Sequence, residues 1–397
     1  MTEEIKKELT EHIIPFWNKL VDYDNGGFHG SVTHDLIVEK GGVKNAVLHA
    51  RILWFYSNCY TVLKTPAYLD MARHCYDFII KNFLDRESGG AFWSVNVKGV
   101  PVNPMKHGYC NAFLVYALSA YYEASRDQSA LNNAMRVFET IETRMADKIG
   151  YLEAFDRNWK PIENELLSPK TKEFIAVKTT GTVLHLIEAY TELYKVSKNE
   201  DVASRLKYLL ALVETKIFDK SNRCLPEFFD KNMNPMNNVH VYGHSVEGAW
   251  LIRRAIDVLG DELPFERQYE LEGMCRALIE KIEQTAFDDW GALRYESRGN
   301  FINKSRAWWP QAEAFIAFSD AYKRDGIPRY LSRSRILWKF IKEHIIDKRE
   351  GGEWLNELNT DNIPKKLPIV SDWKCPYHNG RMCLMAITEQ YVEFEDQ

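Results

Sequence analysis

The chain has 397 residues, of which 45% are hydrophobic, and it carries a formal net charge of −5 at pH 7. This length allows two or three average domains or one large fold, and the hydrophobic fraction is sufficient for a sizeable core. Because the net charge is small and the basic residues are dispersed, the composition excludes the basic surface typical of nucleic-acid-binding proteins and a basic membrane-seeking helix.

Short glycine-and-aromatic segments recur along the chain, about 60 to 70 residues apart, and such a period indicates a repeat architecture. Most of them follow an acidic residue, which is typical of a tight turn or a short hairpin. In chain order the segments are 26–28 after Asp24, 89–93 after Asp85, 150–151 after Asp147, the weaker 222–225 after Asp219, 291–293 after Asp288 and 351–354 after Asp347.

Between successive segments the sequence has room for two helices, and apolar residues at helical spacing fill that room. With one helix before the first segment and one after the last, the pattern predicts six helix pairs. The predicted helices are 3–20, 45–63, 67–83, 108–125, 130–145, 180–196, 201–217, 243–259, 265–286, 307–323, 330–346 and 378–393.

The first helix after each segment is richer in small and apolar residues than the second, as residues 111–120 and 201–207 illustrate. This difference predicts an inner ring buried on both sides and an outer ring that touches water. We therefore expect an all-α fold closed into a ring, with short hairpins or loops at one end. An open helical-repeat scaffold that binds another protein is the alternative.

Reactive and aromatic side chains lie in or just before the first turns of the predicted inner helices. In a closed ring these ends face one mouth, so the side chains would form a single pocket. They are His49 and Arg51; His107, Tyr109 and Asn111; His185; Tyr242, His244 and Glu247; Arg306, Trp308, Trp309 and Glu313; and Trp373, Tyr377, His378 and Arg381.

In residues 242–250, His244, Glu247 and Trp250 fall three residues apart and would share one helix face. An imidazole, a carboxylate and an indole on one face suit proton transfer on a sugar. Ordinary packing remains the alternative. Likewise, His185 within an apolar run also fits a hydrogen-bonded core histidine, and Arg51 also fits the partner of a buried carboxylate.

Competing chemistries lack their motifs. The sequence has no His-Glu-x-x-His, no cysteine cluster, no Gly-x-Gly-x-x-Gly or phosphate-binding loop, and no Gly-x-Ser-x-Gly. We therefore expect neither a metal nor a nucleotide cofactor. Glycoside hydrolysis needs two carboxylates, for which Glu247 and Glu313 are candidates. The predicted pocket is richer in histidine than in carboxylate, which favours proton transfer at a carbon next to a carbonyl.

The compartment follows from cysteine usage and from the first residues. Seven cysteines, without any Cys-x-x-Cys, fit a reducing environment. Residues 1–10 lack the apolar segment of a signal peptide, and no later run of about 18 apolar residues would span a membrane. We expect a cytoplasmic protein, a monomer or weak homodimer, whose partner is a small molecule rather than nucleic acid or a membrane.

Three motifs carry a family resemblance: residues 242–250 (Tyr-Gly-His-Ser-Val-Glu-Gly-Ala-Trp), 306–313 (Arg-Ala-Trp-Trp-Pro-Gln-Ala-Glu) and 373–383 (Trp-Lys-Cys-Pro-Tyr-His-Asn-Gly-Arg-Met-Cys). With residues 13–17, 51–55 and 343–354 the likeness covers nearly the whole chain. These motifs resemble the N-acylglucosamine 2-epimerase superfamily, most closely its members that act on β-1,4-linked disaccharides.

The resemblance implies one catalytic domain over residues 1–397, an (α/α)6 barrel. It implies conversion of the reducing-end glucose of disaccharides such as cellobiose and lactose to mannose, through a cis-enediolate and without a cofactor. It also implies site residues: His244 and His378 as the acid/base pair, His185 for ring opening, Arg51 for the oxyanion, Glu247 orienting His244, and Glu313 and Tyr109 contacting hydroxyl groups. The sugar platforms would be Trp373 and either Trp308 or Trp309, because adjacent residues of a helix point about 100° apart. Asn111, Trp250 and Arg381 complete the predicted substrate-binding set.

Two positions depart from the pattern of those members: Gly181 stands where asparagine is usual, and Ser245 stands where aspartate is usual. Both predicted acid/base histidines are retained, so the substrate stays more open than the reaction. A monosaccharide 2-epimerase and a mannose–fructose isomerase of the same superfamily remain alternatives, and an (α/α)6 glycoside hydrolase is a less favoured one.

Overall fold

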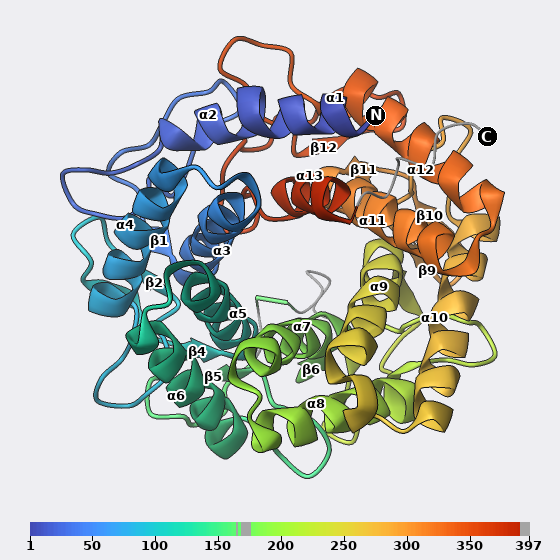
Figure 1. The fold of residues 1–397 in the computed structure, drawn as a ribbon, viewed down its shortest axis with the longest axis horizontal. Helices are drawn as coiled ribbons and strands as arrows, with labels where there is room; N and C mark the ends of the chain where they lie inside the picture. Colours follow the sequence, from blue (N-terminus) through green and yellow to red (C-terminus); the bar gives the residue numbers. More distant parts are fainter. Residues whose placement is uncertain (164–165, 168–175, 390–397) are drawn as a thin grey trace.

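The computed structural model describes residues 1–163, 166–167 and 176–389, whose helices form two concentric rings (Figure 1). Each helix of the inner ring packs against the next, and the last one packs against the first, so the ring is closed. The inner helices are α3 (Ala46–Leu63), α5 (Gly108–Ser125), α7 (Thr180–Ser197), α9 (Tyr242–Leu259), α11 (Trp308–Asp325) and α13 (His378–Thr388). The predicted (α/α)6 barrel is confirmed.

The outer ring surrounds these helices with the other member of each pair (Figure 1). Its helices are α1 (Thr2–Lys7) and α2 (Ile14–Asn18), joined by the π-helix η1 (Glu8–Ile13), then α4 (Pro66–Asn82), α6 (Gln128–Arg144), α8 (Glu200–Leu212) followed by η2 (Val213–Ile217), α10 (Phe265–Thr285), and α12 (Pro328–Phe340) followed by η4 (Ile341–Ile345). The 3-10 helix η3 (Gly260–Glu262) links α9 to α10.

Most predicted helix ends lie within a few residues of the observed ones, but the predicted helix 3–20 is not one α-helix. A π-helical turn interrupts it and ends just before Pro15 in the first turn of α2. Proline lacks the N–H of the normal ladder and its ring clashes with the carbonyl four residues earlier, so the hydrogen-bond register changes there. The predicted end of the last helix, residue 393, lies outside the described residues.

Burial explains which helices lie inside. Every residue of α5 from Gly108 to Tyr121 is buried, as expected for a helix covered on both sides. In α6 the buried residues recur every three or four positions, with one adjacent pair, and they are Ala130, Ala134, Val137, Phe138 and Ile141. This single apolar stripe faces the inner ring, and the rest of α6 meets water.

Each recurring glycine-and-aromatic segment forms a tight hairpin closed by an antiparallel bridge, as between Leu84 and Ala91. In five of them the predicted aspartate accepts a hydrogen bond from the backbone N–H two residues later; Asp85, for example, accepts from Glu87. The first segment also forms a hairpin after Asp24, but there the aspartate that accepts a backbone N–H two residues later is Asp22, which accepts from Asp24. Asp22 is therefore the counterpart of the other five aspartates.

Short strands precede the inner helices α3, α5, α7, α9 and α11, and each pairs with a strand of the next repeat. The antiparallel pairs are β1 (Lys44–Asn45) with β2 (Ser94–Val95), β4 (Lys106–His107) with β5 (Ala154–Phe155), β6 (Lys178–Thr179) with β7 (Phe228–Phe229), β8 (Val239–Val241) with β9 (Glu296–Arg298), and β11 (Arg306–Ala307) with β12 (Glu357–Leu358); β3 (Pro101–Asn103) and β10 (Phe301–Asn303) extend two of them. These pairings bring the amino ends of the inner helices together at one end of the barrel.

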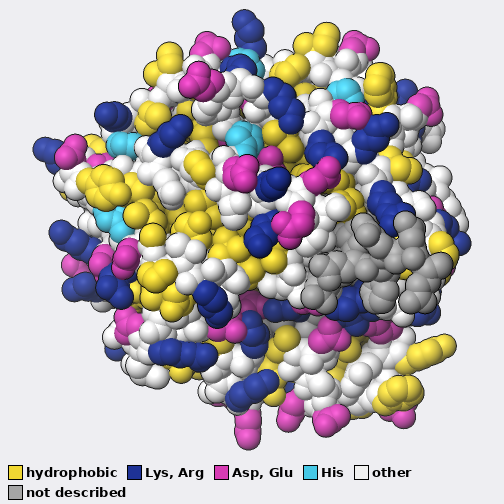
Figure 2. All heavy atoms as spheres, turned by 45° about the horizontal axis from the view of Figure 1, so that its top comes forward, with side chains coloured by type: hydrophobic (Ala, Val, Ile, Leu, Met, Phe, Trp, Pro, Cys, Tyr) yellow, Lys and Arg dark blue, Asp and Glu magenta, His cyan; other side chains and the backbone are white. Residues whose placement is uncertain are grey.

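The surface carries acidic and basic side chains side by side. Figure 2 shows them intermixed over one face of the molecule, without a broad area of one sign. No helix in the described part of the chain is long and apolar enough to cross a membrane. All seven cysteines are buried and none forms a disulfide.

Candidate active site

A cavity of about 390 Å³ lies at the end of the barrel where the inner helices begin. It collects side chains from α3, α5, α7, α9 and α11 and from the turn that leads into α13, so residues far apart in the sequence meet there. The predicted site residues that line it are Arg51, Tyr109, His185, His244, Glu247, Trp308, Trp309, Trp373 and His378.

His244 lies in the first turn of α9, and its side chain is 19% exposed at the cavity wall. Its Nδ1 lies 2.6 Å from Oε2 of Glu227. A carboxylate only accepts hydrogen bonds, so Nδ1 carries the hydrogen and Nε2 is the nitrogen that exchanges a proton. The prediction that Glu247 orients this ring is wrong, because Glu247 lies one turn further along α9 and contacts Arg381.

His378 is the first residue of α13 and reaches the cavity from the opposite part of the chain. Its Nδ1 donates to Oε1 of Glu313 at 2.6 Å. The ring is therefore held in the same way as that of His244, with Nε2 as its reactive nitrogen. The predicted contact of Glu313 with substrate hydroxyls is not supported, since this residue is fully buried and does not line the cavity.

The two rings are driven toward opposite protonation states. At His378 burial dominates over the attraction of Glu313, and nearby Arg51 acts in the same direction, so the pKa is lowered to about 3. At His244 burial also opposes the charged form, but Glu227 outweighs it and raises the pKa. Near neutral pH the cavity therefore holds a neutral base in His378 and a more readily protonated acid in His244.

Trp309 lies between the two imidazoles. Its ring centroid is 5.1 Å from that of His244 and 5.5 Å from that of His378. The indole rests on the backbone of Gly243, where an added Cβ would lie 2.4 Å from the ring. Adjacent Trp308 also lines the cavity but is more deeply buried. Of the two tryptophans, Trp309 therefore offers the ring surface between the proposed acid and base.

His185 lies deeper in the cavity, between the rings of Tyr109 and Phe113, each with its centroid 4.6 Å away. Its Nδ1 donates to Glu188 at 3.0 Å, and its Nε2 has no partner among the described residues. Burial, with Arg51 nearby, lowers the pKa of His185 well below its usual value. The ring is therefore neutral, with a free lone pair on a nitrogen at the cavity wall.

Arg51 is buried without a carboxylate partner among the described residues. Its Nη2 donates to the hydroxyl of Tyr109 at 2.8 Å, and its Nη1 donates to the carbonyl of Trp373 at 3.1 Å. Its guanidinium lies 4.3 Å from the ring centroid of Phe113. Buried arginines usually pair with carboxylates, so an unpaired one at a cavity wall provides a positive charge for a bound anion or a developing oxyanion.

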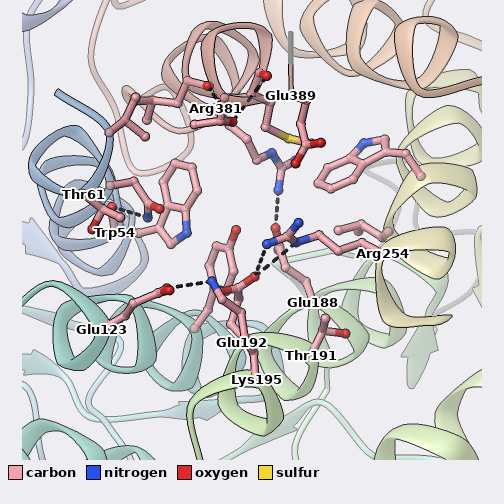
Figure 3. Close-up of a pocket in the computed structure, with 18 residues that line it drawn as sticks. Trp54, Thr61, Glu123, Glu188, Thr191, Glu192, Lys195, Arg254, Arg381 and Glu389 are labelled. Atoms are coloured by element: carbon pink, nitrogen blue, oxygen red, sulfur yellow. Dashed lines mark hydrogen bonds and ion pairs between the residues drawn. The ribbon is translucent and has the colours of Figure 1, made fainter. Parts of the chain in front are cut away.

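Arg381 does not line this cavity. It lies behind it and forms ion pairs with Glu188, Glu247 and Glu313, including contacts of 2.6 Å to Glu247 and 2.7 Å to Glu313. Figure 3 shows its guanidinium directed at Glu188 in the centre of the barrel. Burial raises the pKa of Glu247, whereas Arg381 overcomes burial and lowers the pKa of Glu313. These ion pairs support a positioning role for Arg381, which fixes the carboxylates that hold His185 and His378.

A second cavity, of about 210 Å³, lies at the other end of the barrel (Figure 3). Lys195 joins Glu123 and Glu192 there, and Glu192 also pairs with Arg254, so its charges neutralise one another. No histidine lines it. Trp250 faces this cavity rather than the active-site cavity and donates its indole N–H to Glu313 at 2.9 Å, which supports a role in holding that carboxylate.

Asn111 is also outside the active-site cavity. Its amide accepts from the backbone N–H of Ala91 and donates to the carbonyl of His107, at 3.1 and 2.9 Å. It thus ties the first turn of α5 to the preceding hairpin. His49 makes the same kind of tie in α3, to the N–H of Phe28, which supports a structural role for it.

Sequence reasoning missed Glu227, which lies at the cavity wall one residue before β7. Tyr295 and Asn356 stand at the same place before β9 and β12, and they also line the cavity. Aligning the repeats by their short strands instead of by their turn glycines places these three residues at equivalent positions, each directly before a strand. That alignment could have indicated Glu227. Glu227 falls beside the weakest of the recurring segments, where that alignment was least evident.

Comparison with known proteins agrees with this geometry. Residues 26–379 match the family model of N-acylglucosamine 2-epimerase. The chain is 47% identical over 389 residues to a cellobiose 2-epimerase of Ruminococcus albus, with 98% of each chain covered. Its structure superposes on that of a sugar epimerase from a ruminal bacterium with a TM-score of 0.95 and 47% sequence identity, covering 98% of this chain and 99% of the other. It superposes on cellobiose 2-epimerase from Bacillus thermoamylovorans with a TM-score of 0.94 and 38% sequence identity, at the same coverage.

Proposed function

The chain belongs to the N-acylglucosamine 2-epimerase family, and from that premise we propose that it is a cellobiose 2-epimerase. It interconverts the reducing-end glucose of β-1,4-linked disaccharides with mannose. The observation that carries the proposal is the pair His244 and His378: each imidazole is held through Nδ1 by a buried carboxylate, and both line one cavity with their pKa values shifted in opposite directions.

The first step opens the sugar ring, because the proton at C2 becomes acidic only when C1 is a carbonyl. The neutral His185, whose Nε2 has no partner among the described residues, takes the proton of the C1 hydroxyl. Glu247, whose pKa burial raises, is a candidate donor to a sugar oxygen, since it lines the cavity and its Oε2 has no hydrogen-bond partner among the described residues. The result is the open-chain aldose.

Proton transfer at C2 follows. The neutral His378 removes the C2 proton, and the electron pair moves through C1 onto the carbonyl oxygen, which gives an enediolate. The guanidinium of Arg51, which lacks a carboxylate partner in the described part of the chain, stabilises that oxyanion. His244 then returns a proton to the opposite face of C2, so glucose becomes mannose. The reverse reaction exchanges the two roles.

The substrate lies along Trp309, between the two imidazoles, with the non-reducing sugar toward Trp373 and Tyr295 at the mouth. Aromatic faces suit the C–H surfaces of sugar rings. The remaining site assignments, including Trp308 and Tyr109 as contacts, form part of this proposal. So do a single catalytic domain, a cytoplasmic location and a monomer or weak homodimer.

We also propose that the reaction uses no metal. In the described residues, Glu247, Glu313 and His378 bring three ligand atoms within 4.8 Å of one another, which is a geometry that could hold an ion. Arg381 already lies against this cluster, with Nη2 2.6 and 2.7 Å from the two carboxylates. A bound cation would have to displace a buried guanidinium, so the positive charge is supplied by the arginine.

Product analysis tests the function. The protein is incubated with cellobiose, lactose, mannobiose and mannose, and the products are separated by chromatography. We expect cellobiose and lactose to give disaccharides that end in mannose, without free monosaccharide. Release of glucose would indicate a hydrolase and would contradict the proposal, as would products that end only in fructose.

A further inference from the structure

We infer that the missing side chain of Gly181 leaves a small space beside His244, here called the seat, which holds one hydroxyl group of the sugar. This glycine would then be a specificity-determining residue. The inference rests on the proposed function and refines it. Gly181 is the second residue of α7 and lines the active-site cavity. The missing side chain leaves space next to the acid/base histidine and its carboxylate partner, Glu227.

Neither backbone strain nor crowding explains a glycine at this position. Gly181 is absent from the residues with positive φ, so its backbone conformation is open to any residue. An added Cβ would lie 3.4 Å from Cε1 of His244 and 3.6 Å from Oε1 of Glu227, which are ordinary contacts. Glycine is a poor helix former, so its presence in α7 calls for another reason.

Other glycines of the inner helices differ in this respect. An added Cβ would lie 2.4 Å from the Trp309 ring at Gly243 and 2.5 Å from the Phe55 ring at Gly380. At these positions a neighbouring ring fills the space that the glycine leaves, and packing requires the small residue. At Gly181 the nearest atom to the added Cβ is about 1 Å farther away than at Gly243 or Gly380, and the space beside the glycine is part of the cavity.

The start of α7 also leaves a hydrogen-bond donor without a partner. In α3 the side chain of Asn45 accepts from the N–H of the second helical residue, Val47. In α5 the side chain of His107 accepts from the equivalent N–H, that of Tyr109. These side chains satisfy donors that a helix cannot satisfy internally.

In α7 the capping residue Thr179 accepts instead from the third residue, Thr182, at 3.2 Å. The backbone N–H of Gly181 has no partner among the described residues. First-turn N–H groups point out of the amino end of a helix, which here borders the cavity. The position therefore offers a free donor as well as free space.

The acceptor beside that donor is Glu227, which is 5% exposed. Its Oε2 binds His244, and its Oε1 has no hydrogen-bond partner in the described part of the chain. A hydroxyl group both accepts and donates. One sugar hydroxyl in the seat would accept from the N–H of Gly181 and donate to Oε1 of Glu227, which would fix the ring orientation next to His244.

The Gly181→Ala variant tests the seat, because it adds one methyl group and keeps the N–H. We expect kcat/KM for cellobiose to fall about 10- to 100-fold, as for loss of a hydrogen bond to a charged group. The melting temperature should be unchanged or higher, since alanine favours the helix. Gly273→Ala is the matched control: Gly273 is an exposed glycine in α10 with nothing within 4 Å of its Cβ position, and we expect its kinetics to be unchanged.

Analogues of cellobiose that lack single hydroxyl groups on the reducing-end ring locate the interaction. For one analogue, the ratio of wild-type to Gly181→Ala kcat/KM should fall toward one, because the group that clashes with the methyl is gone. An equal loss for cellobiose and for every analogue, or no loss for cellobiose, would overturn the inference.

A binding measurement separates this inference from the proposed function. Cellobiitol, the reduced disaccharide, cannot be epimerised, and it should raise the melting temperature of the wild type more than that of Gly181→Ala. If cellobiitol raises the melting temperature of the wild type more than that of Gly181→Ala but the protein epimerises no disaccharide, the proposed function is refuted and the inference about Gly181 still holds. Equal shifts in the two proteins would refute the seat.

Discussion

The carboxylate of Glu227 accepts a 2.6 Å hydrogen bond from Nδ1 of His244, although the two residues lie 17 positions apart in the sequence. Replacing Glu227 by glutamine keeps an acceptor and removes the charge. Burial is then opposed only by the charges of Glu247 and Glu313, so the pKa of His244 falls, and we expect kcat/KM to fall about 10- to 100-fold. Glu296→Gln is the control, because Glu296 lines the cavity but pairs with Arg298. Equal loss in both variants would contradict an orienting role for Glu227.

The pH dependence of kcat/KM follows from the two histidines. The active form carries one proton on the pair, on His244. Because Glu227 raises the pKa of His244 above its usual 6.5, the proton is present below that raised value and lost as the pH rises through it. Activity should therefore decline on the alkaline side, and it should decline on the acid side only as His378, with a pKa of about 3, becomes charged. Initial rates across the pH range test this. The alkaline decline should move to lower pH in Glu227→Gln; a profile unchanged by that substitution would contradict the assignment.

Arg51 should matter for the reaction and little for folding. No carboxylate in the described residues pairs with it, so Arg51→Met leaves no opposite charge uncompensated. We expect kcat to fall about 100- to 1,000-fold, as for other oxyanion-stabilising donors, without a lower melting temperature. Circular dichroism and steady-state kinetics measure both. A large loss of stability with the specific activity retained would show that Arg51 is structural.

Unlike Arg51→Met, the Arg381→Met variant should lower the stability of the fold. It leaves Glu188, Glu247 and Glu313 buried together without their shared counter-charge. Removing one partner of a buried ion pair costs about 3–5 kcal/mol of stability. Urea unfolding should show a loss of at least this size. An unchanged unfolding midpoint would mean that these carboxylates are protonated together in the folded protein.

Asn111→Ala separates a structural role from substrate binding. The variant removes the acceptor of the Ala91 N–H, which lies in a buried region, and the hydrogen bond that the amide donates to the carbonyl of His107. A buried donor without a partner costs about 1–3 kcal/mol. We expect a lower melting temperature, with KM and kcat retained below it. A raised KM at unchanged stability would restore the role in substrate binding that the sequence suggested.

The ring itself was predictable because its signals are local and repeated. Turn aspartates and helical periodicity recur in every repeat, and turn glycines recur in all of them except the segment at 222–225, so an uncertain copy is supported by the others. The first segment shows the limit: the glycines and Asp24 mark the hairpin, but the residue that accepts its backbone N–H groups is Asp22. Sequence places a turn more easily than it places the contacts within the turn.

Depth in the barrel was harder to predict than position around it. His244, Glu247 and Trp250 do share one face of α9, but six residues of helix rise about 9 Å, so the face runs down the barrel axis. His244 therefore lines the mouth and Trp250 faces the second cavity. For the same reason Glu313 and Arg381 hold other side chains in place instead of lining the cavity. Helix periodicity predicts which face of the helix a side chain lies on, but only the packing of the barrel determines how far from the active-site cavity that side chain lies along the axis.

The central claim is proton transfer at C2 between two histidines. The direct measurement is incubation of the protein with cellobiose in D2O, followed by NMR of the product. We predict a disaccharide ending in mannose with solvent deuterium at C2, and no exchange with His244→Ala or His378→Ala, each folded by circular dichroism. A mannose product without deuterium at C2, or full exchange in either variant, would contradict the account.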